Sequence, residues 1–223
     1  MRARNRRKWR RFLSSALIIG GCFLLGRGAR EIFDAYWGQR QANKEFANRL
    51  GKPAPESKTP GSKTVPNVPA PPARPHLEPG ETVARLSIPR LGAELYVVEG
   101  TDNRDLRLGP GHMPGTALPG ENGNCVIAGH RDTHFRILRK IRPGDEIALE
   151  TLEGRFVYTV DGTAIVKPTN VSSLAPSKSG VLHLITCYPF YFFGHAPKRF
   201  VVEAKLDPQL SASARAKAPA GPN

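Results

Sequence analysis

The sequence predicts a mainly β domain, either a barrel or a sandwich, that follows an N-terminal hydrophobic segment and a linker. Three observations lead to this prediction. Residues 76–208 contain successive β-type runs divided by turn signals, without the strand–helix alternation that is typical of a parallel α/β fold. Residues 12–26 carry no charge, and residues 51–75 are rich in Pro, Lys and Ser with little apolar bulk.

The predicted domain is expected to hold seven or eight strands and small helices. Its β-type runs are 83–89, 93–100, 124–130, 145–166, 181–187 and 199–206. The longest run is interpreted as a hairpin, with Glu153 and Gly154 at its tip. Apolar residues at helical spacing predict a short helix over 133–141, with Asp132 or Thr133 as its cap.

Residues 1–30 are interpreted as a basic cytoplasmic tail and a transmembrane anchor. Seven basic residues precede the uncharged run 12–26, and by the positive-inside rule this asymmetry puts the N-terminus in the cytoplasm. The run is shorter than the about 20 residues of a typical span, and a cleaved signal peptide is the alternative. Because the following GRGAREIF offers no good small-residue cleavage site, we favour an uncleaved single-pass anchor with the rest of the chain extracytoplasmic.

A Pro/Lys-rich extracytoplasmic linker is expected over residues 31–75, beginning with a short amphipathic helix through Phe33, Tyr36 and Trp37. The composition of the remainder cannot bury a core and favours extended, polyproline-like conformations. Such a linker would hold the domain, expected over residues 76–208, off the membrane. Small and polar residues predict a disordered tail at the C-terminal end, over the fifteen residues 209–223.

The net charge of +14 does not indicate a nucleic-acid partner. Residues 76–208 carry fifteen basic and fifteen acidic residues, so the excess belongs to the ends of the chain, and the domain presents no net field to a polyanion. Three cysteines without a CxxC pair are too few for a disulfide scaffold and do not suggest a zinc site. No cofactor or metal is expected, and Cys125 is interpreted as a structural thiol.

Cys187 is the candidate nucleophile, because it stands where an apolar strand ends in a loop. Taken alone, a cysteine in such a strand is more often a small buried hydrophobic residue. Its surroundings change the balance, since Thr186 precedes it, an aromatic loop follows it, and Arg199 opens the next strand. If these strands pair, Arg199 falls beside the thiol, where a cation favours the thiolate and can stabilise an oxyanion.

A thiolate nucleophile needs a proton-transfer partner, and two of the six histidines are candidates from their positions. His130 ends a strand, and His195 lies in the loop that follows Cys187. His183 shares a strand with Cys187, but a separation of four positions along a strand is about 13 Å, which is too far for pairing. His134 is expected to lie on the surface of the short helix.

Three segments in order, NCVIAGHRDTHF, LITCYPF and APKRFVV, make the chain resemble the sortases, the cysteine transpeptidases of bacterial surfaces. The resemblance covers about residues 82–206 and is strongest to class D sortases. It implies an eight-stranded sortase-type β-barrel with short helices behind a membrane-anchor helix. The catalytic roles carry over to His130, Cys187 and Arg199, and a substrate-positioning role carries over to Thr186. The family's T-L-x-T-C motif has a histidine in place of its first threonine here.

The resemblance implies a membrane-anchored enzyme that cleaves an LPxTG-like sorting signal. The Cys187 thiolate would attack a backbone carbonyl, His130 would protonate the departing amine, and an amine of the cell envelope would resolve the thioacyl enzyme. Arg199 would hold the substrate or stabilise the oxyanion. The implied partners are a surface protein with a sorting signal, an amine acceptor and the membrane. The enzyme is expected to be a monomer that binds no nucleic acid.

Two other functions stay open at this point. A secreted papain-like cysteine protease would also use Cys187 and a histidine, but its cysteine precedes its histidine along the chain, and here the order is reversed. A non-catalytic surface scaffold or adhesion module could keep the barrel without the chemistry. Asp132 is not interpreted as the third member of a catalytic triad, because its position at a helix start suits a cap.

Overall fold

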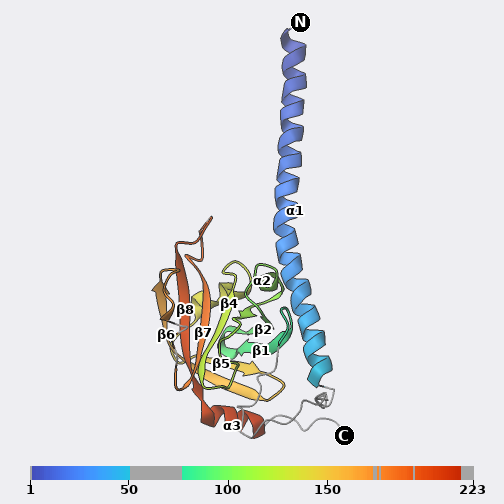
Figure 1. Ribbon diagram of the computed structural model, residues 1–223. Coiled ribbons are helices and arrows are strands. Elements are labelled where there is room, and N and C mark those ends of the chain that lie inside the picture. The colour runs from blue at the N-terminus through green and yellow to red at the C-terminus, as the bar shows by residue number, and fades with distance from the viewer. Residues whose placement is uncertain (1, 51–76, 173–174, 176, 193, 217–223) are drawn as a thin grey trace, which may run out of the picture.

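The computed structural model describes residues 2–50, 77–172, 175, 177–192 and 194–216. The strands among them are β1 (Thr82–Ile88), β2 (Ala93–Glu99), β3 (Gly111–His112), β4 (Gly123–Gly129), β5 (Glu146–Glu150), β6 (Arg155–Val166), β7 (Gly180–Tyr188) and β8 (Lys198–Asp207). The helices are α1 (Arg2–Leu50), η1 (Pro89–Leu91), α2 (Asp105–Leu108), η2 (His134–Lys140) and α3 (Pro208–Ala216). The strands close into one barrel in the order β1-β2-β3-β4-β7-β8-β6-β5 (Figure 1). The predicted eight-stranded, mainly β fold is confirmed.

Two antiparallel pairs of the barrel are joined at the turns that the sequence predicted. β1 pairs with β2 across η1, and Gly92, with φ at 61°, ends η1 in the left-handed conformation. β5 pairs with β6, and Gly154, with φ at 145°, lies at the tip of this hairpin, where its carbonyl accepts a 2.8 Å bond from the Thr151 N–H. Glycine adopts positive φ without the steric cost that a Cβ brings.

The barrel interior is filled by side chains that alternate along the strands with outward-facing ones. Buried side chains of the strands include Leu86, Ile88, Val97, Ile127, Ile147, Leu149, Tyr158, Leu182, Leu184 and Val202. Phe135 and Leu138 of η2 are also fully buried and belong to the same cluster. The core therefore fixes the segment that follows β4.

The short helix predicted over 133–141 is present as η2, and one of the two predicted cap residues holds the N-cap position without making a capping bond. Thr133 is the N-cap residue, and its side chain makes no capping hydrogen bond. The Asp132 carboxylate instead lies 3.4 Å from the Arg131 Nε atom. Because Phe135 and Leu138 are buried, packing rather than a cap holds this short 3-10 helix in place.

The C-terminal half of α1 packs along one side of the barrel, and its N-terminal half extends beyond the barrel (Figure 1). The Gln39 side chain completes the backbone bonding of an edge residue of β2, because its Oε1 accepts from the Tyr96 N–H at 2.6 Å and its Nε2 donates to the Tyr96 carbonyl at 2.9 Å. The Phe46 and Tyr96 rings meet edge to face at 6.1 Å. Arg49 forms an ion pair with Glu81.

A short helix was predicted at the start of residues 31–75, and residues 31–50 are helical. They continue α1, and the aromatic side chains expected to form its apolar face are exposed, by 58% for Phe33 and 51% for Trp37. The buried side of this half of the helix instead contains Ala42 and Phe46. The remainder of the predicted linker lies outside the described residues.

Residues 209–216, at the start of the predicted disordered tail, are helical and form most of α3. The Ser211 hydroxyl ties α3 to the barrel, because it accepts a 2.9 Å hydrogen bond from the Val157 N–H of β6. The prediction of disorder is wrong for these residues, and 217–223 lie outside the described chain. No helix within the described residues is both long and apolar enough to cross a lipid bilayer.

Candidate active site

Strand pairing brings the three predicted catalytic residues to one end of the barrel. β4 and β7 run parallel, and Gly129 is paired with Thr186. The residues that follow them, His130 and Cys187, therefore lie level with each other. Neighbouring strands are about 4.8 Å apart. β7 and β8 run antiparallel, and Cys187 is paired with Arg199. The Cys187 thiol therefore lies between His130, at the end of the neighbouring strand β4, and Arg199 on the neighbouring strand β8.

Cys187 lies on the outward-facing side of β7. Leu182, Leu184 and Thr186 are buried and alternate with it, so the residues between them face away from the core. Cys187 is a free thiol and is partly exposed. A partly exposed thiol at the end of a rigid strand is accessible to a substrate.

Two contacts hold the backbone directly before His130. The Thr186 hydroxyl donates a buried 2.7 Å hydrogen bond to the Gly129 carbonyl and so ties β7 to β4. The Phe135 ring packs against Gly129, where an added Cβ would lie 2.6 Å from the ring carbon Cδ2. Thr186, which was predicted to position the substrate, thus contacts the strand that carries His130.

Arg131 is a residue at the site that the sequence reasoning missed. Its side chain is 9% exposed and reaches the loop between β7 and β8. Its Nη1 donates to the Pro189 carbonyl at 3.1 Å, and its Nη2 donates to the carbonyls of Phe192 at 2.6 Å and Gly194 at 3.2 Å. One buried guanidinium therefore connects the loop after His130 with the loop after Cys187.

The Arg199 side chain is fixed by its own loop. Its Nη1 donates to the carbonyls of Ala196 at 3.3 Å and Lys198 at 3.1 Å. A guanidinium has five N–H donors in a planar arrangement, so other donors are left for a substrate oxygen. Arg199 is partly exposed, as access by a substrate requires.

His134 is buried and not on the surface, which corrects the expectation from the sequence. Burial, and to a smaller extent the nearby His130 ring, lowers the pKa of His134 to about 4, while a backbone contact to Ala35 of α1 opposes the shift. The imidazole of His134 is therefore neutral near pH 7. This contact also shows that α1 lies against the segment that carries His130.

The other described histidines lie elsewhere. His112 is buried, and its Nδ1 lies 2.7 Å from the Glu99 carboxylate. His183 is buried on β7, and burial lowers its pKa. His195 is exposed in the loop between β7 and β8. The pairing of β4 with β7 favours His130 over His195 as the partner of the thiol, because it puts His130 on the adjacent strand.

Cys125 is a buried free thiol, as predicted. It is paired with Leu182, which lies five residues before Cys187 and therefore about 17 Å away along β7. Burial raises the pKa of the Cys125 thiol, so it stays protonated and is a poor nucleophile. This separation and burial exclude Cys125 from the site.

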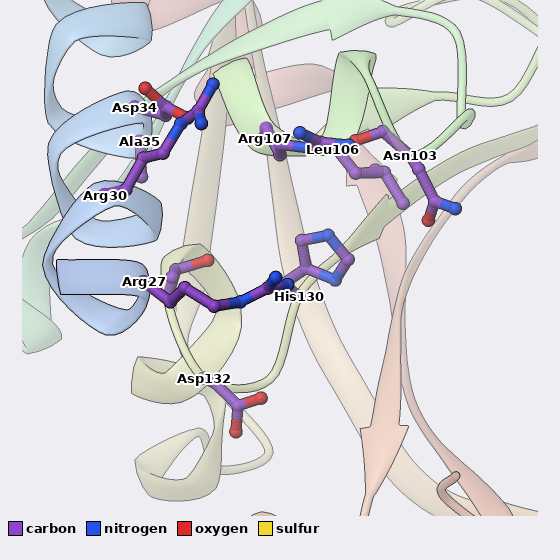
Figure 2. A pocket seen from close by; sticks show the side chains of 10 residues that line it. Arg27, Arg30, Asp34, Ala35, Asn103, Leu106, Arg107, His130 and Asp132 are labelled. Carbon is purple, nitrogen blue, oxygen red and sulfur yellow. The ribbon is translucent and has the colours of Figure 1, made fainter. Parts of the chain in front are cut away.

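A cavity of about 560 Å³ opens beside His130 (Figure 2). Its walls come from α1, from α2 and its flanking loop, and from the segment after β4: Arg27, Arg30, Asp34, Ala35, Asn103, Leu106, Arg107, His130, Asp132 and Thr133. In Figure 2 the Arg27 side chain reaches from α1 toward His130. Within the described part of the chain, no three His, Cys, Asp or Glu side chains are arranged to hold a metal ion.

Known proteins match both the sequence and the fold. A family model described as the Sortase domain matches residues 86–207. Sortase D of Bacillus subtilis (strain 168) is 36% identical over 191 residues, which cover 85% of this chain and 94% of that protein. Sortase SrtE1 of Streptomyces coelicolor is 33% identical over 168 residues, which cover 67% of this chain and 44% of that protein.

Solved structures agree with these matches. The Clostridium perfringens Sortase D5 transpeptidase aligns with a TM-score of 0.63 and 26% identity, covering 76% of this chain and 98% of that chain. The SrtA sortase from Actinomyces oris aligns with a TM-score of 0.55 and 32% identity, covering 62% of this chain and 87% of that chain. With a matching domain model, a relative similar over nearly its whole length and the same barrel, this chain belongs to the sortase family of cysteine transpeptidases.

Proposed function

We propose that this chain is a membrane-anchored sortase that cleaves an LPxTG-like sorting signal and transfers the acyl part to an amine. Cys187 is the nucleophile, His130 is the acid and base, and Arg199 holds the substrate oxygen. The observation that carries the proposal is the strand register, in which Cys187 is paired with Arg199 on one side and is level with His130 on the other.

In the acylation step, the Cys187 sulfur attacks the carbonyl carbon of the scissile peptide bond. A C–S bond forms, and the electron pair of the carbonyl moves onto its oxygen. When the carbonyl re-forms, the C–N bond breaks and His130 gives its proton to the departing nitrogen. The C-terminal fragment leaves, and Cys187 holds the N-terminal fragment as a thioester.

In the resolving step, the nitrogen of an acceptor amine attacks the thioester carbon. A C–N bond forms, the C–S bond breaks, and its electron pair returns to the Cys187 sulfur. His130 takes the proton that the amine nitrogen loses. The products are the amide and an enzyme with a thiolate and a protonated imidazole, ready for the next acylation.

Arg199 acts on the oxygen that becomes negative in both steps. Its position opposite Cys187 and the two carbonyl contacts that fix its Nη1 support a directed role. Preorganised donors stabilise a developing oxyanion more than a mobile charge does, because they need no reorganisation during the reaction.

The proposal includes a single-pass anchor over residues 12–26, with the N-terminus in the cytoplasm and the barrel outside. The uncharged run and the seven basic residues before it support this topology. Carbonate extraction of membranes and protease digestion of intact spheroplasts test it. The expected result is a membrane-bound chain whose barrel is digested from outside. Recovery of a shortened chain in the medium would indicate a cleaved signal peptide instead.

The proposed partners are a surface protein with a sorting signal and an amine of the cell envelope, and the enzyme is proposed to act as a monomer. A quenched peptide with an LPxTG-like signal tests the activity of the full chain, with and without triglycine as acceptor. The wild type should cleave the peptide and form the triglycine product. Cys187→Ala and His130→Ala should reduce both products to background, whereas Cys125→Ala should retain them.

The same assay separates the alternatives. Cleavage without any amide product, even at high triglycine concentration, would identify a cysteine protease and contradict transfer. Absence of cleavage, together with no labelling of Cys187 by a peptide vinyl sulfone, would identify a non-catalytic scaffold.

A further inference from the structure

The cavity beside His130 is built as much from α1 as from the barrel. Its lining includes Arg27, Arg30 and Asp34 of α1, Arg107 of α2 and His130 (Figure 2). The cavity, at about 560 Å³, is large enough for several amino-acid residues. None of the steps written above for the sorting signal uses this space.

The position of α1 against the barrel is fixed close to the cavity. A Cβ on Gly38 would lie 2.6 Å from the Leu108 Cα, so the α1 and α2 backbones touch there. The Gln39 amide bonds to the carbonyl of Leu108 at 2.9 Å as well as to β2. Arg27 lies about 18 Å further along the same helix. These contacts fix the backbone of α1 beside α2, and the helix carries Arg27 and Arg30 to the cavity.

The cavity reaches one member of the catalytic group and not the others. His130 lines it, but neither Cys187 nor Arg199 is among its described lining residues. A molecule in the cavity could therefore contact the base without displacing a peptide bound at the thiol and the arginine. The acceptor amine has this requirement, because it must meet His130 while the acyl group is still attached to Cys187.

The charges in the cavity favour an acceptor that carries a carboxylate. Asp34 lies 3.8 Å from Arg30 on the same helix, and Asp132 lies 3.4 Å from Arg131. The two carboxylates of the lining thus already face arginines. Arg27 reaches toward His130, and Arg107, whose Nε donates to the Asn103 carbonyl at 3.1 Å, adds a guanidinium from the opposite wall. Guanidinium groups bind carboxylates through paired N–H donors.

We infer that this cavity is the acceptor subsite, and that Arg27 and Arg107 bind a carboxylate of the acceptor while its amine faces His130. The inference rests on the proposed function and adds to it the chemical class of the acceptor, a primary amine that carries a carboxylate. The bonds formed and broken are those of the resolving step. The N-terminal helix is thus part of the substrate-binding surface and not only a tether.

The test compares two acceptors that differ in one group, triglycine and triglycinamide. Full-length protein in detergent cleaves a sorting-signal peptide in the presence of each, and the ratio of amide product to hydrolysis product is measured at low salt. This ratio depends only on steps after the thioacyl enzyme has formed. The wild type should give an about fivefold higher ratio with triglycine, as expected for two partly exposed ion pairs.

The double variant Arg27→Gln/Arg107→Gln should give equal ratios with both acceptors, while its cleavage rate without acceptor stays at the wild-type value. Arg40→Gln is the matched control, because Arg40 is on α1 but stacks over the Tyr36 ring at 4.7 Å, away from the cavity. Arg40→Gln should keep the wild-type preference for triglycine over triglycinamide. Equal ratios in the wild type, or a preference that survives in the double variant, would overturn the inference.

Failure of this inference and failure of the proposed function give different results. A double variant that also loses cleavage would contradict the inference, because its arginines would then serve the sorting-signal step. A wild type that cleaves no sorting-signal peptide would instead contradict the proposed function, since acylation precedes any use of an acceptor.

Discussion

Replacing Gly129 with alanine should damage the site through packing alone. The new Cβ would lie 2.6, 2.7 and 2.9 Å from three ring carbons of Phe135. Carbon atoms in van der Waals contact are about 3.5–4.0 Å apart, so the ring or the strand must move by about 1 Å. Phe135 is fully buried and has no free space to turn into. Overpacking of this kind costs about 1–3 kcal/mol of folding free energy.

The displacement should reach the chemistry because His130 follows Gly129 directly. The Gly129 carbonyl is held by Thr186, so the backbone cannot yield on that side without breaking a buried hydrogen bond. Misplacement of a catalytic group by about 1 Å costs about 100-fold in rate. We therefore expect Gly129→Ala to lower kcat by between ten- and 100-fold, with a smaller effect on KM.

Urea unfolding and peptide cleavage measure the two effects. Gly162→Ala is the control, because a Cβ there meets no atom within 4 Å, and it should change neither quantity appreciably. The double variant Gly129→Ala/Phe135→Leu should recover part of the lost activity, since leucine removes ring atoms from the overlap. Wild-type stability and turnover in Gly129→Ala would show that the Phe135 contact does not hold His130.

Three further outcomes are expected. Arg199→Ala should lose about 100-fold in activity, and Arg199→Lys should lose most of that, because a point charge lacks the planar donors. Lys198→Ala, on the other face of β8, should stay near wild type, and full activity in Arg199→Lys would refute a directed role. Arg131→Met should free the loop after β7, and this should appear as faster chymotrypsin cleavage and at least tenfold slower turnover; unchanged proteolysis would contradict it. The guanidinium of Arg90 holds the pKa of Asp145 below its usual range, so the ionised pair stabilises the fold above about pH 4, and this stabilisation is lost as the pH falls further. The urea midpoints of wild type and Asp145→Asn should therefore converge as the pH falls below about 4, and a difference between them that persists at about pH 2 would contradict this account.

Seven of the eight strands were predictable because each carries its own local signal, whereas the two-residue β3 lies in none of the predicted runs. Alternation of apolar and polar residues and the turn residues at Gly92 and Gly154 set the strands and their hairpins. The pairing of Cys187 with Arg199 also followed from the order of two adjacent strands. The parallel pairing of β4 with β7, which brings His130 level with the thiol, joins segments more than fifty residues apart and was not predicted. The choice of His130 over His195 came only from the family resemblance.

Long-range polar contacts were the part that the sequence could not indicate. Gln39 bonds to backbone atoms of Tyr96, and Arg131 bonds to three carbonyls of a loop; backbone groups occur at every residue, so neither contact leaves a pattern. The docking of α1 was missed for a related reason. Phe33 and Trp37 were predicted to form its apolar face, whereas the docked side contains the Gln39 amide, Ala42 and Phe46, which lie further along the helix.

The burial of His134 was not predicted, because it lies on a short helix. In η2, whose length is only seven residues, the face that a residue occupies is poorly defined by spacing, so a histidine beside apolar positions was expected on the surface. Contact with α1, which comes from a segment about 100 residues earlier, buries it. All five residues of the string His-Arg-Asp-Thr-His are therefore buried or line the cavity, whereas the sequence indicated a catalytic role for His130 alone.

The central claim is that Cys187 carries the acyl group, and mass spectrometry tests it most directly. The full-length protein is mixed with a sorting-signal peptide and quenched in acid within the first turnover, and the adduct is mapped by peptide sequencing. We expect a mass increase equal to the N-terminal fragment of the peptide, located on Cys187 and absent in Cys187→Ala. An adduct on Cys22 or Cys125, or cleavage that continues in Cys187→Ala, would contradict the account.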